Sequence, residues 1–237
     1  MFPIGDDDSD LKTFPYVNYF LIAANIIVYV IFQQLGTNDA FTYAYSTVPR
    51  EIVTGVDLQG VQDILDETGR VIGRVRLEPS PQPLFLTVIS STFMHGSFMH
   101  IFGNMLYLWI FGDNLENRLG HFRYLAFYMV CGTLAAIAQI ATDSNSIIPM
   151  LGASGAISGV LGAYLLMFPR RRVTVLLFVF VTHVPAAIAL GAWIIFQVIE
   201  SLYKNPAAGG VAYMAHIGGF IGGFVLVKVF ALGTSKS

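Results

Sequence analysis

Charged side chains are scarce in this chain of 237 residues: Asp, Glu, Lys and Arg together make up 12% of it. A typical soluble domain carries about 25%. Hydrophobic residues account for 55%, the mean hydropathy is +0.65, and several apolar runs are long. The composition therefore favours a polytopic membrane protein over a soluble one.

Cysteine and a basic N-terminal segment are also lacking. The single Cys131 excludes an internal disulfide framework. The first apolar run is preceded by four aspartates, where a signal peptide would carry positive charge. We therefore expect this run to be retained as a first transmembrane helix.

The apolar stretches predict an all-α membrane protein with six transmembrane helices, each needing ~20 residues if upright. Their expected ranges are 16–35, 98–114, 122–142, 154–168, 184–203 and 211–232. The fourth is short, which is better tolerated in the centre of a bundle than against lipid. Residues 173–203 are too long for one upright helix and too short for two. Residues 173–182 are therefore predicted to be an interfacial or partly inserted approach to the fifth helix.

The expected domain organisation follows from these ranges. An acidic N-terminal tail covers residues 1–14, the membrane domain covers 15–232, and a short C-terminal tail covers 233–237. A long polar loop, 36–83, separates the first two helices. Gly69 predicts a turn in it, followed by a short strand over 71–77.

Lys and Arg in the loops set the expected orientation. Arg170, Arg171 and Arg172 follow the fourth helix directly and mark an inner face. We therefore predict that both termini lie inside.

In that orientation four polar residues from three helices lie near the outer face. Ser154 begins the fourth helix, and His100 and Asn104 lie in the first two turns of the second. His216 lies ~8 Å below the outer boundary, at ~1.5 Å of rise per residue.

Ser154 has the surroundings of a nucleophile. Gly152 and Gly155 leave the nearby backbone uncrowded, and free N–H groups at a helix N-terminus suit a developing oxyanion. The alternative is an ordinary N-cap serine among small packing residues. Ser158 is a rival nucleophile, but it lies one turn further into the helix, where packing is the simpler role.

His216 is an ionisable residue inside an apolar helix, which is costly and points to function. Small residues at four-residue spacing would bring its helix close to the one that begins with Ser154, and the two side chains would then form a dyad. No Asp or Glu is placed to join them. A histidine that only hydrogen-bonds between helices is the alternative. The glycines expected at close helix contacts are Gly152, Gly155, Gly159, Gly218, Gly219, Gly222 and Gly223.

His100 and Asn104 are four residues apart and share a helix face. Amide and imidazole donors aimed into a pocket would stabilise an oxyanion. A metal site formed by His95, His100 and His216 is a weaker alternative, because carboxylate or Cys partners are missing. His95 is expected to order the loop before the second helix.

Three motifs in this order resemble the rhomboid family of intramembrane serine proteases: His100-xxx-Asn104, Gly152-Ala153-Ser154-Gly155, and Ala215-His216-Ile217-Gly218-Gly219. The segment 114–120 resembles the family's loop after the second helix. The resemblance implies a six-helix fold with a partly embedded first loop. It also implies serine endopeptidase activity on single-span membrane proteins, with Ser154 as nucleophile and His216 as base.

One position departs from the family pattern. Many members carry an aromatic residue four positions after the nucleophile, packed against the histidine, whereas this chain has Ser158. Another side chain must support the imidazole here, or its orientation is looser.

Two other classes of function stay open: a catalytically inactive rhomboid-like protein that binds transmembrane helices, and a small transporter or channel. A transporter is disfavoured, because the polar residues gather near one face instead of crossing the bilayer. We expect a lipid bilayer and membrane protein substrates as partners, and no cofactor, metal or nucleic acid. The expected location is a prokaryotic plasma membrane; the oligomeric state is not specified by the sequence.

Overall fold

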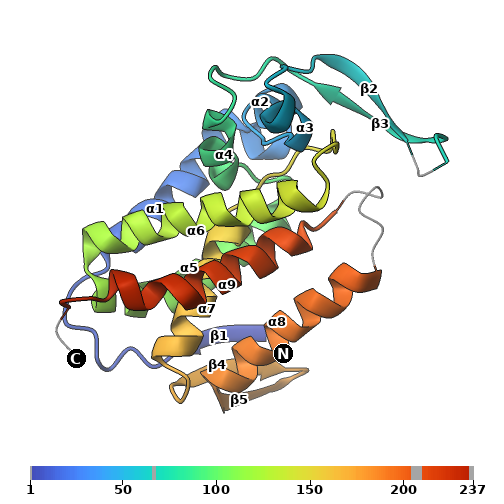
Figure 1. The fold of residues 1–237 in the computed structure, drawn as a ribbon. Helices are drawn as coiled ribbons and strands as arrows, with labels where there is room; N and C mark the ends of the chain where they lie inside the picture. Colours follow the sequence, from blue (N-terminus) through green and yellow to red (C-terminus); the bar gives the residue numbers. More distant parts are fainter. Residues whose placement is uncertain (1, 66–67, 204–209, 235–237) are drawn as a thin grey trace.

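The computed structural model describes residues 2–65, 68–203 and 210–234, which form a helical bundle with two small β-sheets (Figure 1). The helices and helical turns are α1 (Tyr16–Ile27), η1 (Val28–Phe32), η2 (Gln34–Gly36), α2 (Asp39–Ala44), α3 (Pro49–Thr54), α4 (Leu86–Ser90), η3 (Ser91–Phe93), α5 (Phe98–Leu119), α6 (His121–Thr142), α7 (Ser154–Met167), α8 (Ala186–Tyr203) and α9 (Tyr213–Phe230). The strands are β1 (Phe2–Asp6), β2 (Gly60–Leu65), β3 (Val71–Leu77), β4 (Arg172–Leu177) and β5 (Phe180–Pro185).

Candidate membrane-spanning helices are present among the described residues. Three of them, α6, α8 and α9, are long and apolar enough to cross a bilayer, and two shorter apolar helices cover Tyr16–Phe32 and Ser154–Met167. The sixth predicted helix, α5, has 22 residues and carries charged residues in its last turns. Each predicted helix therefore exists, while the count of six crossings stays a prediction.

The short helix α7 lies in the centre of the bundle, where it packs against α5, α6, α8 and α9. Ten consecutive residues of it, 155–164, are buried. Pro169, which cannot continue a helix, follows its end. The expectation that the short fourth helix is central is confirmed.

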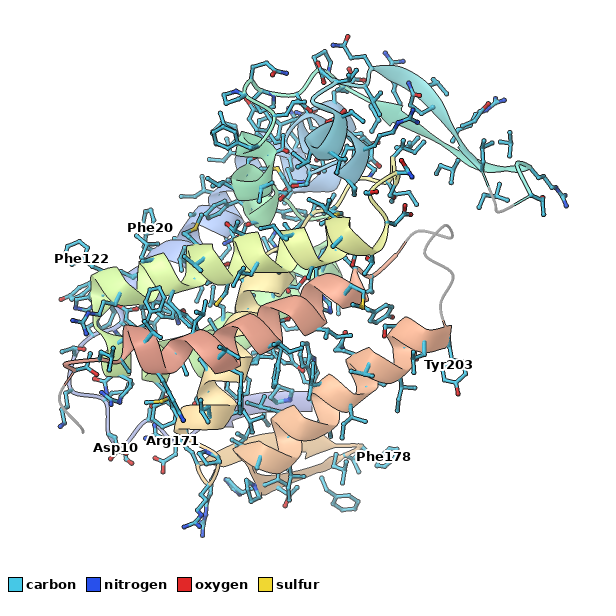
Figure 2. All side chains as sticks on the ribbon, viewed as in Figure 1. Asp10, Phe20, Phe122, Arg171, Phe178 and Tyr203 are labelled. Atoms are coloured by element: carbon cyan, nitrogen blue, oxygen red, sulfur yellow. The ribbon has the colours of Figure 1, made fainter. Side chains whose placement is uncertain are left out.

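The outer faces of the bundle carry large apolar side chains. Phe20, Phe122 and Tyr203 point away from it in Figure 2 and are 63%, 90% and 85% exposed. Exposed apolar area on this scale is unfavourable in water, whereas lipid accepts it. The bundle thus presents the surface that a bilayer requires.

The segment after α7 has a secondary structure that the sequence analysis did not specify, and its interfacial or partly inserted position stays a prediction. It forms a β-hairpin, β4–β5, and β1 pairs antiparallel with β4 to complete a three-stranded sheet. The segment is rich in Val and Thr, whose branched side chains favour strands, and Val173 and Val175 of β4 are buried. A count of residues per span could not detect this hairpin. The strand predicted over 71–77 is confirmed as β3, which pairs with β2 in the first loop.

The N-terminal segment is also not a free tail. Besides forming β1, it is held by Asp6, which accepts hydrogen bonds from the Tyr164 hydroxyl and the Asn114 amide. Asp10 forms an ion pair with Arg171 at 2.7 Å, and Figure 2 shows these two side chains at the same end of the molecule. These partners are distant in the sequence, and the sequence analysis named the acidic tail without predicting them.

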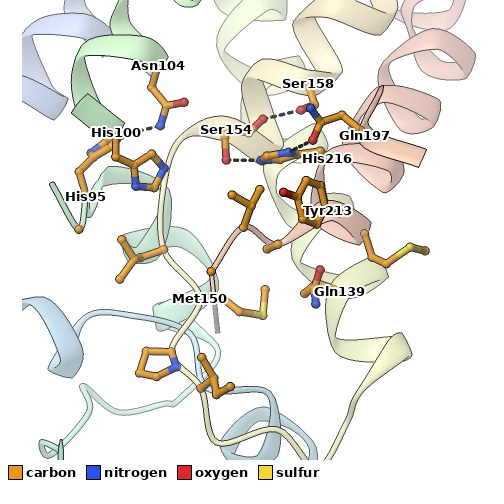
Figure 3. A pocket seen from close by; sticks show the side chains of 18 of the residues that line it. His95, His100, Asn104, Gln139, Met150, Ser154, Ser158, Gln197, Tyr213 and His216 are labelled. Atoms are coloured by element: carbon orange, nitrogen blue, oxygen red, sulfur yellow. Dashed lines mark hydrogen bonds between the residues drawn. The ribbon is translucent and has the colours of Figure 1, made fainter. Parts of the chain in front are cut away.

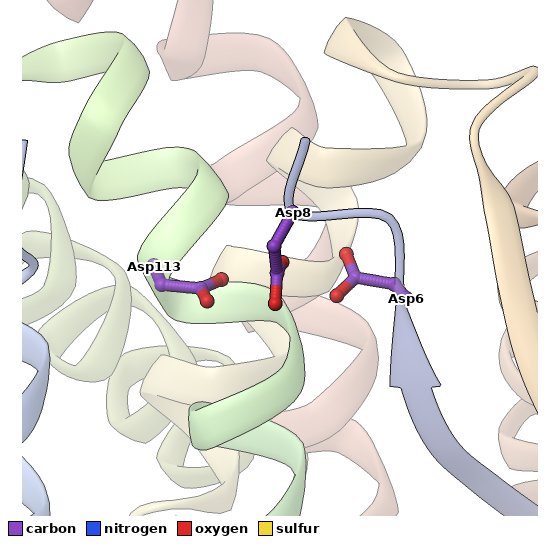
Figure 4. A group of neighbouring side chains, drawn as sticks. All are labelled: Asp6, Asp8 and Asp113. Carbon is purple, nitrogen blue, oxygen red and sulfur yellow. The ribbon is translucent and has the colours of Figure 1, made fainter. Parts of the chain in front are cut away.

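Two carboxylates of this segment lie close to one of α5. Oxygen atoms of Asp6, Asp8 and Asp113 lie within 4.8 Å of one another (Figure 4). Burial, together with the neighbouring carboxylates Asp113 and Asp8, raises the pKa of Asp6 from 3.8 to about 8, although the hydrogen bond from Tyr164 opposes the shift. The protonated form of Asp6 is therefore favoured in the folded protein at neutral pH.

Replacing Asp6 by asparagine should change how stability depends on pH. The folded state holds the Asp6 proton more tightly than the unfolded state, so this group stabilises the fold most at low pH. That contribution declines as pH rises from about 4 to about 8. Relative to the original protein, the Tm of Asp6→Asn should increase over this interval and level off above it. Thermal unfolding in detergent from pH 5 to pH 9 measures the difference.

Asp7→Asn is the matched control. Asp7 is exposed, and hydrogen bonds from Ser9 lower the pKa of its carboxyl below 3.8, so it stays ionised between pH 5 and pH 9. Its Tm difference from the original protein should be flat over that range. A flat difference for Asp6→Asn as well would contradict the raised pKa of Asp6.

Glu116 connects the end of α5 to the start of α1. It lies in the last turns of α5, which continues to Leu119, and it is fully buried. Its carboxylate accepts from the backbone N–H groups of Val17 at 3.0 Å and Asn18 at 2.7 Å. These are N–H groups that the first turn of α1 leaves without helical partners. The 114–120 segment thus fixes one helix against another.

The two ends of the bundle differ. Near Ser154, the first loop contacts the α6–α7 loop, where the backbones of Thr47 and Met150 pair at 2.7 and 3.0 Å. At the far end of α7 lie the sheet β1-β4-β5 and the end of α9, with Arg118 bonded to Thr234. Both terminal segments therefore lie away from Ser154, as the loop charges predict. Their side of the membrane stays a prediction.

Candidate active site

A cavity of about 1190 Å³ opens at the Ser154 end of the bundle. Its walls come from α5, α7, α8 and α9, from the α6–α7 loop, and from the first loop, which contributes Tyr43, Pro49 and Arg74. Figure 3 shows Ser154, His216 and other polar side chains of the cavity. Much of the remaining lining is apolar. The cavity thus surrounds a few polar groups with apolar side chains, as ligand sites commonly do.

Ser154 and His216 are brought together by the starts of two helices. Ser154 is the first residue of α7, and His216 lies in the first turn of α9. The Ser154 Oγ lies 2.8 Å from the His216 Nε2 (Figure 3). Only 9% of His216 is exposed. The pair has the distance that proton transfer from a hydroxyl to an imidazole requires.

Glycines allow this approach. A Cβ at Gly219 would lie 2.1 Å from the carbonyl oxygen of Gly155, and a Cβ at Gly223 would lie 1.9 Å from that of Gly159. Both distances are far inside van der Waals contact. Only hydrogen at these two α9 positions allows the α7 backbone to come so close.

The other two α9 glycines face a different helix. A Cβ at Gly218 would lie 2.2 Å from the Cβ of Ala138, and one at Gly222 would lie 3.0 Å from the Leu134 Cδ1, both on α6. The α9 glycines therefore form two contacts, one with α7 and one with α6.

Gly152 differs from the expectation that it packs between helices. It lies in the loop before α7 with φ +122°, where a Cβ would be 2.7 Å from the His100 Nε2. L-residues with a side chain rarely adopt such a φ. Gly152 thus makes room for the His100 imidazole beside the nucleophile.

Asn104 is held by His95. The Asn104 Nδ2 donates to the His95 Nε2 at 2.9 Å, and the ring of His95 packs edge-on against that of His100. Burial, with a smaller effect from His100, lowers the pKa of His95 to about 3. His95 is therefore neutral and can accept from the amide. It orders Asn104 as well as its own loop, which bonds to Gln33.

Sequence reasoning missed two neighbours of His216, both on α8. The Gln197 Oε1 lies 2.8 Å from the His216 Nδ1, and the Trp193 ring packs 5.9 Å from the imidazole, centroid to centroid. A polar glutamine in an otherwise apolar stretch, four residues after a tryptophan, was the available signal. Gln197 and Trp193 contact the imidazole here, whereas in many family members an aromatic residue at the position of Ser158 is expected to do so.

The remaining alternatives find little geometric support. Ser158 donates to the backbone oxygen of Ser154 at 2.6 Å, which is a local bond within the helix. The metal alternative needs three converging imidazoles. The ring nitrogens of His216 instead meet Ser154 and Gln197, and His95 meets Asn104.

Comparisons with known proteins address the family. The sequence matches the rhomboid domain over residues 83–232. It is 38% identical over 143 residues to Rhomboid protein 1, mitochondrial, of Saccharomyces cerevisiae, which covers 56% of this chain and 38% of that protein. It is 33% identical over 146 residues to RHOMBOID-like protein 5 of Arabidopsis thaliana, and the match covers 61% of this chain and 44% of that protein. It is 33% identical over 144 residues to Rhomboid protease GluP of Bacillus subtilis, and the match covers 61% of this chain and 25% of that protein.

The matched region spans less than half the length of each of these three relatives. The expected prokaryotic plasma membrane gains no support from them, since the yeast relative is mitochondrial by name. The matched domain nevertheless covers more than half of the chain and contains Ser154, His216, His100 and Asn104. On that ground the chain belongs to the rhomboid family.

Proposed function

We propose that this protein is an intramembrane serine endopeptidase that hydrolyses peptide bonds in or near the transmembrane segments of single-span membrane proteins. The observation that carries the proposal is the 2.8 Å hydrogen bond between the Ser154 Oγ and the His216 Nε2 within the cavity. Two facts support it: the chain belongs to the rhomboid family, and the relative GluP is a protease by name.

The proposed reaction begins at the Ser154 hydroxyl. The His216 Nε2 takes its proton while the Oγ attacks a peptide carbonyl carbon, and the imidazolium then protonates the leaving amine. An acyl group stays bonded to the Ser154 Oγ. Water gives a proton to His216 and its oxygen to the acyl carbon, and the Oγ leaves with the proton returned.

The oxyanion is proposed to bind where α7 begins. The backbone N–H of Ser154 is one donor, because a first-turn N–H has no helical acceptor. His100 and Asn104, which line the same cavity, are the side-chain donors. Asn104 has two amide hydrogens, of which the bond to His95 uses one. Fixed donors of this kind supply a large part of transition-state stabilisation.

A fluorophosphonate probe tests the proposal without knowledge of the substrate. The purified protein in detergent is treated with the probe, digested, and mapped by mass spectrometry. We expect one phosphonyl adduct, on Ser154 and not on Ser158, because only Ser154 bonds to an imidazole nitrogen. Heat-denatured protein should remain unmodified.

Other outcomes have definite meanings. An adduct on Ser158 would assign the nucleophile to that residue. No adduct on a protein that unfolds cooperatively on heating would favour an inactive member of the family that binds transmembrane helices.

A further inference from the structure

The imidazole of His216 is held from two sides. Its Nε2 meets Ser154 on α7, and its Nδ1 meets the Oε1 of Gln197 on α8 at 2.8 Å (Figure 3). Gln197 is 6% exposed. Burying an amide in apolar surroundings is unfavourable unless it is hydrogen-bonded. The His216 Nδ1–H gives the Gln197 oxygen such a bond.

The placement of Gln197 follows from the helix that carries it. The buried residues of α8 are Ala186, Leu190 and Gln197, which fall on one stripe of helical spacing. Trp193 lies on the same stripe and packs against both His216 and Phe220. The face of α8 that contacts α9 therefore directs the Gln197 amide at the His216 imidazole.

The bond at Nδ1 decides what Nε2 can do. A neutral imidazole carries one N–H, and an acceptor at Nδ1 keeps the hydrogen there. Nε2 then presents its lone pair to the Ser154 hydroxyl, as a general base requires. When His216 takes a proton, the amide oxygen also faces the new positive charge. A glutamine does this without burying a second charge in the bundle.

We propose that Gln197 is a positioning residue that fixes the orientation and tautomer of His216, while Trp193 packs against the imidazole ring. This inference rests on the proposed role of His216 as the base. It also accounts for Ser158: the support that many family members are expected to draw from an aromatic residue on α7 comes from α8 in this chain.

Other groups near His216 bear on the pH profile. His100 on α5 faces it across the cavity, Tyr213 lies one turn before it on α9, and Glu200 on α8 accepts from the Tyr213 hydroxyl at 3.3 Å. None of them is altered by a substitution at Gln197. A change in the profile on substitution of Gln197 therefore reports the contact with His216.

The experiment compares Gln197→Leu and Gln197→Glu with the original protein. Cleavage of a single-span reporter in proteoliposomes gives kcat and KM, and fluorophosphonate labelling gives the reactivity of Ser154 alone. Gln197→Leu should lower kcat and the labelling rate about 10- to 100-fold and change KM less than about 3-fold, because base function is impaired and substrate binding is not. Gln197→Glu still accepts a hydrogen bond from the Nδ1–H, so its kcat should stay within about 5-fold of that of the original protein. Its carboxylate should shift the acid limb of the kcat profile upward by about one pH unit.

Gln139→Leu is the matched control, since the Gln139 oxygen accepts from the Ala215 backbone and not from an imidazole. Its kcat should stay within about 3-fold of that of the original protein, because the net contribution of one hydrogen bond is modest. Gln197→Met provides a second apolar variant if the leucine variant does not fold. The positioning role is overturned if the apolar variants keep full activity. It is equally overturned if Gln197→Glu loses as much as Gln197→Leu with an unchanged pH profile. Failure of the original protein to label would instead count against the proposed function.

Discussion

Replacing Ser154 by alanine is expected to lower kcat for cleavage of a single-span reporter by about 10⁴-fold or more, with little change in KM. The Ser154 Oγ is the only proposed nucleophile, and no other hydroxyl in the described residues is hydrogen-bonded to His216. His216→Ala should have a loss of similar size. The double variant should be no worse than either single one, because the two residues act as one unit. Initial rates in proteoliposomes at saturating and limiting reporter measure each value.

Ser158→Ala is the control for this prediction. The Ser158 hydroxyl is buried and donates to a carbonyl within its own helix, so its removal should change kcat less than about 3-fold. Equal losses in Ser158→Ala and Ser154→Ala would contradict the assignment of the nucleophile. Additive losses in the double variant of Ser154 and His216 would contradict the dyad.

The contact between Ser154 and His216 could be predicted because it depends on local signals. A serine at a helix start, a histidine in an apolar helix and four-residue glycine spacing each have one simple interpretation, and together they predict two helices in close contact. Gln197 could not be found in this way. Its importance depends on the rotation of α8 about its axis, which places Gln197 and Trp193 against His216.

Two segments adopt structures that the sequence analysis did not specify. The segment that forms the hairpin β4–β5 was interpreted from its hydropathy and its length, and neither quantity distinguishes a hairpin from another kind of approach to a membrane helix. No partner was predicted for the N-terminal aspartates, but Asp6 is partly buried and bonds to side chains of α5 and α7. The pairing of β1 with β4 and the contacts of Asp6 join residues more than one hundred positions apart, for which no local pattern exists.

The second large effect is expected at the contact of α7 with α9. Gly219→Ala places a Cβ 2.1 Å from the Gly155 carbonyl oxygen, which is backbone and cannot rotate aside. The helices must therefore separate, and overpacking of this kind costs about 1–3 kcal/mol or more. Gly155 adjoins Ser154, so the displacement reaches the nucleophile directly. Because a shift of ~1 Å can cost ~10²-fold in rate, we expect a loss of that order in kcat and a lower Tm.

Gly222→Ala separates this steric effect from the general effect of adding a methyl group to α9. A Cβ at Gly222 meets the Leu134 Cδ1 at 3.0 Å, the far end of a flexible side chain that can move. Alanine also favours a helix over glycine by about 1 kcal/mol, which offsets a small adjustment. Gly222→Ala should therefore keep kcat within about 3-fold and Tm near that of the original protein. If Gly219→Ala behaved in the same way, α7 and α9 would not be in the close contact that brings His216 to Ser154.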